Sequence, residues 1–360
     1  MTACLPIPRS SCASRDARQR RAERACPRRR RGCNWPQTRV ATVTTGLFDL
    51  ALTSSAYRNT TDPALAEHTH ADPHAGASTS FGIAGLQLAL TAGDNLEKLG
   101  AEIAGVARRF PWVRMILAGE LCGFGAGLDH AECMPGDAEQ RLCRLAAEHG
   151  LWLIPGSLYE LRDGAVHNTT PVINPQGEVI ARYRKIFPFY PYEARIAPGD
   201  EFVVFDVPGA GRFGISICYD MWFPETTRSL VSLGAEVILH PTMTNTIDRD
   251  VEICMARSSA MTNQCYFVDV NVAGELGVGQ SVICGPGGEV IYQAGVGREI
   301  MPFEVDFAYL RRCRARGWHG LGQPLKSFRD NPIIYPAYGA ARAESPALDA
   351  LGPLEMPTQL

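Results

Sequence analysis

Short apolar runs alternate with amphipathic segments along most of the chain. The runs at 81–90 (FGIAGLQLAL) and 113–119 (VRMILAG) are too short and too apolar for exposed helices, so they predict buried strands. Between them, apolar residues recur at helical spacing. This pattern predicts a helix that begins after a capping pair of Asp94 and Glu97 and ends before Pro111.

The same alternation continues to about Arg316. Asn174 and Gly285 each open a turn sequence that predicts a hairpin. Alternating strands and helices indicate an α/β domain at 81–316. Further strands are expected at 151–159, 170–173, 178–184, 202–207, 211–217, 235–240, 265–271 and 301–305, and helices at 137–149, 224–233, 248–262 and through 311–312.

The two ends of the chain lack this pattern. Residues 1–80 are rich in Arg, Ala, Ser, Thr and Pro without a sustained period, which predicts a disordered extension. Its abundant Arg resembles an organellar transit peptide, although a start codon placed too far upstream would look the same. Residues 317–360 form a Gly- and Pro-rich tail, which we expect to take part in oligomer contacts.

Charge and cysteine usage narrow the partners and the compartment. Residues 1–40 hold eleven Arg against Asp16 and Glu23, whereas the net charge of the whole chain is −3. The body is therefore acidic and gives a nucleic acid no electrostatic reason to bind. No apolar run is long enough to span a membrane. Twelve Cys without any CxxC spacing favour reduced thiols in a cytoplasmic protein over a zinc site.

Three residues with useful chemistry each come directly after an apolar strand. They are Glu120, Lys185 and Cys218. Such positions meet at one edge of an α/β sheet. A thiol needs a base to become a thiolate and a positive charge to stabilise the oxyanion that follows, and these side chains supply both.

The segments around two of these residues resemble the nitrilase, or carbon–nitrogen hydrolase, superfamily. GISICYDMWFPE (214–225) is the most specific, and YRKIFPFYPYE (183–193) is closest to the aliphatic amidase and formamidase branch. Ala118 and Gly119 stand where the family commonly has Phe-Pro before its Glu. The resemblance covers roughly 81–316. It implies an αββα sandwich that forms a homodimer or larger homo-oligomer, with no metal and no organic cofactor.

The resemblance also implies a role for individual residues. Cys218 would be the nucleophile, Glu120 the general base and Lys185 the cation beside the tetrahedral intermediate. The backbone N–H of Tyr219 would complete the oxyanion hole. Glu193 matches a second Glu of the amidase branch, where it would orient the substrate amide.

Some of these roles have competitors in the sequence. Glu160 also follows a strand and could be the second carboxylate, although Glu193 is favoured. His240 could form a Cys–His dyad, but we favour a pocket-lining or hydrogen-bonded His. Trp222 could wall the substrate pocket or pack in the core. The remaining cysteines of the body are expected to be structural.

The expected activity is that of a thiol hydrolase. It would cleave a non-peptide C–N bond of a small amide through an acyl thioester on Cys218 and release ammonia or an amine. Tyr219-Asp220 stand where nitrilases usually have Trp-Glu, which favours amides or carbamoyl compounds over nitriles. The alternatives are a nitrilase or N-carbamoyl hydrolase and a non-catalytic nitrilase-like scaffold. No nucleic acid or membrane partner is expected.

Overall fold

The computed structural model describes residues 80–335, 337–338 and 345–356. The disorder expected for 1–80 concerns residues outside this part, apart from Ser80, which begins the first strand.

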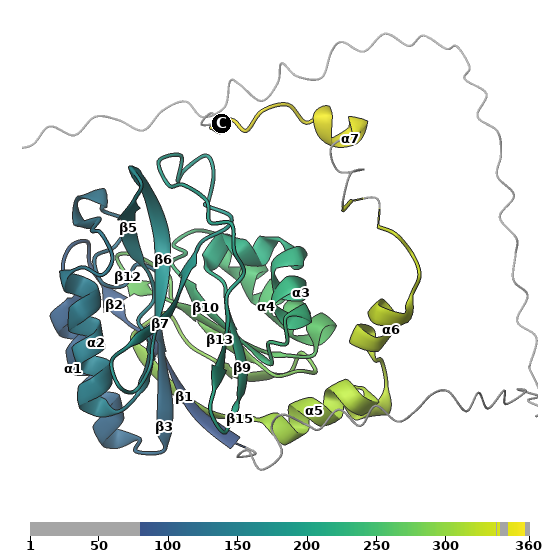
Figure 1. Ribbon diagram of the computed structural model, residues 1–360, viewed down its shortest axis with the longest axis horizontal. Helices are drawn as coiled ribbons and strands as arrows, with labels where there is room; N and C mark the ends of the chain where they lie inside the picture. Colours follow the sequence, from purple (N-terminus) through teal and green to yellow (C-terminus); the bar gives the residue numbers. More distant parts are fainter. Residues whose placement is uncertain (1–79, 336, 339–344, 357–360) are drawn as a thin grey trace, which may run out of the picture. The chain divides into compact units, whose positions relative to one another are not determined.

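Within the described residues, two sheets stack face to face between pairs of helices (Figure 1). The first sheet has the strand order β15-β1-β3-β4-β6-β5, with β7 paired to β6, and the second has the order β14-β13-β11-β10-β9-β8. Helices α1 and α2 pack on the first sheet, and α3 and α4 pack on the second. The architecture is therefore the expected αββα sandwich.

The bounds of the elements follow the predicted runs closely. The strands are β1 Ser80–Gln87, β2 Ala89–Leu90, β3 Val113–Ala118, β4 Trp152–Ile154, β5 Leu158–Arg162, β6 Ala165–Ile173, β7 Val179–Arg184, β8 Val204–Val207, β9 Gly211–Ile215, β10 Val237–Thr242, β11 Tyr266–Asn271, β12 Ala273–Gly274, β13 Val282–Cys284, β14 Val290–Gln293 and β15 Glu299–Asp306. The helices are α1 Leu96–Arg109, α2 Asp137–His149, α3 Pro224–Ser232, α4 Arg249–Asn263, α5 Phe307–Arg316, α6 Pro324–Asp330 and α7 Pro346–Asp349, with 3-10 turns η1 Leu128–His130, η2 Cys218–Trp222 and η3 Trp318–Gly320.

The largest core cluster contains the facing side chains of the two sheets. Ile83 and Met115 of the first sheet belong to it together with Phe213 and Val268 of the second, and all four are fully buried. Separate clusters seal α1 and α2 to the first sheet and α3 and α4 to the second. Because both faces of each sheet carry apolar residues, the central strands read as continuous apolar runs.

Parallel strands bring the predicted chemistry to one edge of the sandwich. β1, β3 and β4 are parallel in the first sheet, and β9, β10 and β11 are parallel in the second. Glu120 and Cys218 follow β3 and β9, so both lie beyond carboxyl ends of parallel strands. A hydrogen bond of 3.2 Å from the N–H of Glu120 to the carbonyl of Thr242 joins the two sheets at this edge.

Three local expectations were wrong in detail. The run 81–90 is divided at Leu88 into β1 and β2, and the run 151–159 is divided between β4 and β5. The second break falls at Pro155-Gly156, where Gly156 has a φ of +80° that ends the extended conformation. Asp94 accepts from the N–H of Leu96 at 2.8 Å, but no capping box with Glu97 forms.

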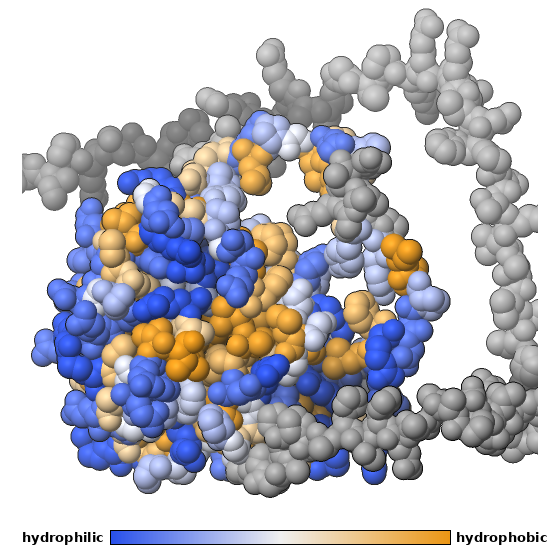
Figure 2. All heavy atoms as spheres, viewed as in Figure 1, coloured by the Kyte–Doolittle hydropathy of each residue, from blue (hydrophilic) through white to orange (hydrophobic). Residues whose placement is uncertain are grey.

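The part of the tail that the structure describes contacts the domain through α6. The ring of Phe328 lies 4.9 Å below the guanidinium of Arg228, which belongs to α3. Figure 2 shows apolar side chains across the middle of the face that it views. Exposed apolar residues include Ile180 and Leu321. Oligomer contacts through 317–360 stay a prediction.

No helix among the described residues is both long and apolar enough to cross a membrane. The cytoplasmic location stays a prediction.

Candidate active site

Glu120 is positioned by a close approach of two backbone segments. A Cβ on Gly119 would lie 2.6 Å from Val272 Cγ1 and 3.1 Å from the carbonyl oxygen of Thr242. Only glycine fits there without a shift of its neighbours, which gives a local reason for the Ala118-Gly119 sequence. The Glu120 side chain is 2% exposed, and it turns into the space between the two sheets.

Lys185 bridges two carboxylates in this space. Its Nζ lies 2.9 Å from Glu120 Oε1 and 2.8 Å from Glu193 Oε2, and the side chain is 1% exposed. Asn168 Nδ2 donates a further hydrogen bond of 2.8 Å to Glu120 Oε1. The backbone N–H of Phe189 donates to Glu193 Oε2 at 2.5 Å. The three ionisable groups therefore hold one another in place and carry one net negative charge.

The electrostatics of this triplet suit a base and a fixed cation. Burial raises the pKa of Glu120, and the nearby Glu193 raises it further against the opposing effect of Lys185. Burial acts to lower the pKa of Lys185, but the charges of Glu120, Cys218 and Glu193 outweigh it and raise that pKa well above its usual value. Lys185 is therefore an ammonium over the whole working range of pH. Glu120 becomes a better proton acceptor than an exposed carboxylate.

Cys218 begins η2 in a strained backbone conformation. Its φ is +45°, a left-handed value that is uncommon for a residue with a side chain and is typical of functional sites. The side chain is half-buried, and its Sγ lies 4.0 Å from Thr244 Oγ1. Burial and the charge of Glu120 raise the pKa of the thiol well above its usual value. The resting group is therefore a thiol that must pass its proton to a base when it attacks.

Asp220 ties the turn of the nucleophile to the segment that carries Lys185. Its carboxylate accepts hydrogen bonds from Tyr183 Oη at 2.6 Å, the N–H of Ile217 at 2.8 Å and the N–H of Phe187 at 2.9 Å. Burial raises the pKa of Asp220 to about 6. Sequence reasoning used this residue only to separate amidases from nitrilases, and its anchoring role was missed.

Two adjoining cavities open beside Cys218. The larger has a volume of about 300 Å³ and is lined by Glu120, Lys185, Glu193 and Cys218, with Tyr159, Phe189, Tyr192, Arg195, Ile196 and other residues. The smaller has a volume of about 110 Å³, and Trp222 lines it. The residues predicted from strand ends therefore share one accessible space.

Two competitors named in the sequence lie elsewhere. Glu160 forms a bidentate ion pair with Arg184 at 2.7 Å and accepts from Thr169 Oγ1 at 2.8 Å, so the structure brings Glu193 and not Glu160 to Lys185. His240 is fully buried and is absent from the lining of both cavities, which corrects the expectation of a pocket position. Its Nδ1 lies 2.7 Å from Ser216 Oγ, and burial lowers its pKa to about 4.

The other described thiols lack the surroundings of Cys218. Burial raises the pKa of Cys122, Cys265 and Cys284 to about 12, as expected of structural residues. Cys133 and Cys254 are exposed. Among the described residues, no group of three or more His, Cys, Asp or Glu side chains could hold a metal ion.

Some neighbours of the site carried no signal in the sequence. Asn168 lies in the middle of β6, and only the pairing of that strand shows that its amide reaches Glu120. Thr244 follows β10 in an ordinary polar segment. Their contribution depends on contacts between residues far apart in the chain, which a single sequence does not reveal.

Comparison with known proteins agrees with this geometry. The family model described as carbon–nitrogen hydrolase matches residues 82–315. The chain is 31% identical to the omega-amidase NIT2 of Homo sapiens over 201 residues, which cover 52% of this chain and 72% of that protein. The omega-amidase NIT2-B of Xenopus laevis is 30% identical over the same length and coverage.

Solved structures of the nitrilase superfamily are also similar. Nit3 of Saccharomyces cerevisiae has a TM-score of 0.62 and 26% identity, and the match covers 66% of this chain and 94% of that one. A mutant of the Nesterenkonia AN1 amidase has a TM-score of 0.59 and 25% identity, with 67% and 95% covered. The chain belongs to the carbon–nitrogen hydrolase family, as an enzyme of the amidase-like part of the nitrilase superfamily.

Proposed function

We propose that this enzyme hydrolyses small amides through an acyl thioester on Cys218. The observation that carries the proposal is the position of Lys185 Nζ, bonded to both Glu120 and Glu193 in a cavity that the thiol also lines. A base, a fixed cation and a nucleophile within one cavity are the parts that acyl transfer to sulfur requires.

The first half of the reaction forms the thioester. Glu120 takes the proton of the Cys218 thiol while the sulfur attacks the amide carbonyl carbon. The oxyanion forms beside Lys185 Nζ and the backbone N–H of Tyr219. The tetrahedral intermediate then collapses, the C–N bond breaks, and the nitrogen leaves as ammonia or an amine with the proton that Glu120 returns. Glu193 holds the leaving nitrogen and Lys185 in position.

The second half regenerates the thiol. A water enters the space left by the amine and loses a proton to Glu120 as its oxygen attacks the thioester carbonyl. The carboxylic acid leaves, and the sulfur of Cys218 regains a proton from Glu120. The raised pKa of Glu120 supports this repeated exchange, because the carboxyl group accepts and returns a proton more evenly near neutral pH.

Named relatives support the class of substrate. The curated matches are omega-amidases, and the Nesterenkonia amidase has been solved in complex with butyramide. A further mutant of that amidase shows covalent addition of the acetamide moiety of fluoroacetamide at its active-site cysteine. The amide class and the cysteine mechanism are thus natural proposals for this chain, with nitriles and N-carbamoyl compounds as the alternatives.

An ammonia-release screen over short amides, carbamoyl compounds and nitriles tests the proposal. We expect release from amides, faster than from the matching nitriles, and loss of release in Cys218→Ala. Cys254→Ala is the matched control, because that thiol is exposed and lies on α4 outside both cavities. Faster release from nitriles would assign the chain to the nitrilases instead.

A non-catalytic scaffold would give a different result. It would release no ammonia from any of these compounds, and Cys218 would react with iodoacetamide no faster than the exposed Cys254. That outcome would overturn the proposed function.

A further inference from the structure

The smaller cavity beside Cys218 has the composition of a subsite for a cation. It shares Phe189, Cys218 and Met243 with the larger cavity. The rest of its lining includes the rings of Tyr219 and Trp222 and the carboxylates of Asp248 and Glu252.

The proposed reaction leaves this cavity for the acyl chain. An amide carbon bears an oxygen, a nitrogen and one further substituent. The groups that serve the oxygen and nitrogen, Lys185, Glu120 and Glu193, all line the larger cavity. The remaining substituent is the acyl chain, and the smaller cavity is the other space that begins at the sulfur.

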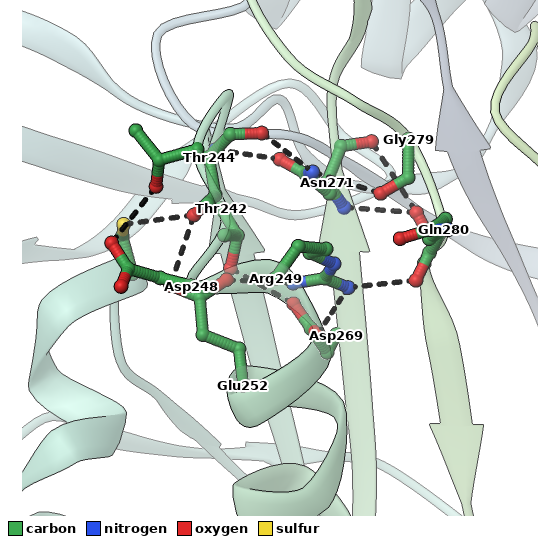
Figure 3. A network of polar contacts seen from close by, with 12 residues as sticks. Thr242, Thr244, Asp248, Arg249, Glu252, Asp269, Asn271, Gly279 and Gln280 are labelled. Carbon is green, nitrogen blue, oxygen red and sulfur yellow. Dashed lines mark hydrogen bonds and ion pairs between the residues drawn. The ribbon is translucent and has the colours of Figure 1, made fainter. Parts of the chain in front are cut away.

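The carboxylate of Glu252 belongs to a buried network with surplus negative charge (Figure 3). One oxygen accepts from Thr244 Oγ1 at 3.0 Å, and the other lies 3.1 Å from Arg249 Nη1. The same guanidinium pairs with Asp269 at 2.6 Å and donates to the carbonyl of Gln280 at 3.0 Å. Two carboxylates therefore share one guanidinium, and all three groups are nearly inaccessible to solvent.

This surplus is visible in the titration of the network. Burial and the charge of Asp269 raise the pKa of Glu252, and the pairing with Arg249 does not compensate for them. A ligand cation in the cavity would supply the missing positive charge.

Asp248 adds a second carboxylate that fold stability does not explain. It occupies the N-cap position of α4, yet its side chain makes no capping hydrogen bond. It accepts from Thr246 Oγ1 at 2.8 Å instead, and its half-buried carboxylate faces the cavity. Among the described residues, no Lys, Arg or His side chain lines this cavity, and no ion pair engages Asp248.

The aromatic walls favour the same kind of ligand. Tyr219 lies between Phe189 and Trp222, with ring centroids at 4.9 Å and 5.8 Å. Aromatic faces attract an ammonium or guanidinium group within about 6 Å of the ring centroid, and they also accept its methylene chain.

We propose that the smaller cavity binds a cationic group at the far end of the acyl chain, and that the preferred substrates are short amides of ω-amino or ω-guanidino acids. Asp248 and Glu252 would receive the charge, and the rings of Tyr219 and Trp222 would pack on the chain. The proposal rests on the proposed function for the placement of the acyl group. It predicts that an amide with a terminal carboxylate is a poor substrate.

Three amides of similar length and different charge test the proposal. They are γ-aminobutyramide, which is cationic, valeramide, which is neutral, and succinamate, which is anionic. Binding is measured by calorimetry on the full-length Cys218→Ala protein, and kcat/KM by ammonia release on the wild-type protein. We expect γ-aminobutyramide to bind about tenfold or more tightly than valeramide, and succinamate to bind most weakly.

Matched variants locate the preference. Asp248→Asn and Glu252→Gln, each combined with Cys218→Ala, should reduce the ratio of cation to neutral binding to a few-fold or less. Asp248→Asn leaves the pairs of Arg249 intact, so it serves even where Glu252→Gln perturbs the fold. Asp250→Asn is the control, because this exposed acid lies on the same helix but outside the cavity lining.

Equal binding of the cationic and neutral amides would overturn the proposal, as would a preference that Asp248→Asn and Glu252→Gln both leave unchanged. These results concern the subsite alone. If the charge preference is present and depends on Asp248, but none of the amides is hydrolysed, the subsite stands and the proposed function fails.

Discussion

Replacing Glu193 by Gln removes one negative charge from the cavity and keeps the length of the side chain. The amide oxygen of Gln can still accept from Lys185 and from the N–H of Phe189, which lie 2.8 Å and 2.5 Å from the present carboxylate oxygen. The substitution therefore tests the charge of Glu193 and the position that it gives to Lys185, with the packing nearly unchanged.

The expected loss follows from these contacts. Hydrogen bonds to charged groups contribute about 1.5–3 kcal/mol and neutral ones about 0.5–1.5 kcal/mol, so Lys185 would be held more loosely. Catalytic groups that lose their alignment cost roughly 10²–10⁴-fold in rate. We expect kcat for ammonia release to fall within that range. Cys218 should still be alkylated by iodoacetamide, because Glu120 remains to accept its proton.

The pH profile gives a readout that a packing defect would not move. Glu120 acts as a base only when it is ionised, so kcat/KM falls as the pH drops through the pKa of Glu120. Burial and then the charge of Glu193 raise that pKa. Removing the charge lowers the pKa, and the acid limb of the profile should move to lower pH in Glu193→Gln.

Glu160→Gln is the matched control for this prediction. Glu160 also follows a strand, but it pairs with Arg184 and makes no contact with Lys185. Its loss should leave kcat close to the wild-type value and lower the melting temperature, by roughly 2–8 °C for about 1–2 kcal/mol. The reasoning is refuted if Glu160→Gln is the severe variant, or if Glu193→Gln keeps nearly full activity with an unmoved acid limb.

Two further substitutions test the neighbours of the base. Asn168→Ala removes the hydrogen bond of 2.8 Å to Glu120 Oε1 and should reduce kcat for ammonia release about tenfold, and unchanged kinetics would show that the amide does not position the base. Gly119→Ala places a Cβ 2.6 Å from Val272 Cγ1 and should lower the free energy of unfolding in urea by about 1–3 kcal/mol, and an unchanged midpoint would contradict the close approach described here.

The fold could be predicted because most elements have their own local signal. The apolar run at 113–119 and the helical spacing around Leu99 mark β3 and α1 without any knowledge of their partners. The strand breaks at Leu88 and Pro155 were missed, because an interrupted strand keeps the same apolar character on both sides of the break. The capping box with Glu97 failed for a related reason, since a cap depends on backbone geometry that sequence spacing only suggests.

The candidate site could be predicted only as far as strand ends and recognisable segments go. Glu120, Lys185 and Cys218 follow strands, and the parallel arrangement brings such positions together. The choice between Glu160 and Glu193 could not be made from position alone, because both follow strands. Strand register decides it, since β6 and β7 place Arg184 where it takes up Glu160.

Mass spectrometry of the enzyme during turnover tests the central claim most directly. The reaction with a short amide is quenched in acid during the first turnovers, and the peptide that carries Cys218 is analysed. The account predicts that this peptide gains the mass of the acyl group and that Cys218→Ala neither forms the adduct nor releases ammonia. Ammonia release by Cys218→Ala at more than a trace level, or an acyl group found on another residue, would contradict it.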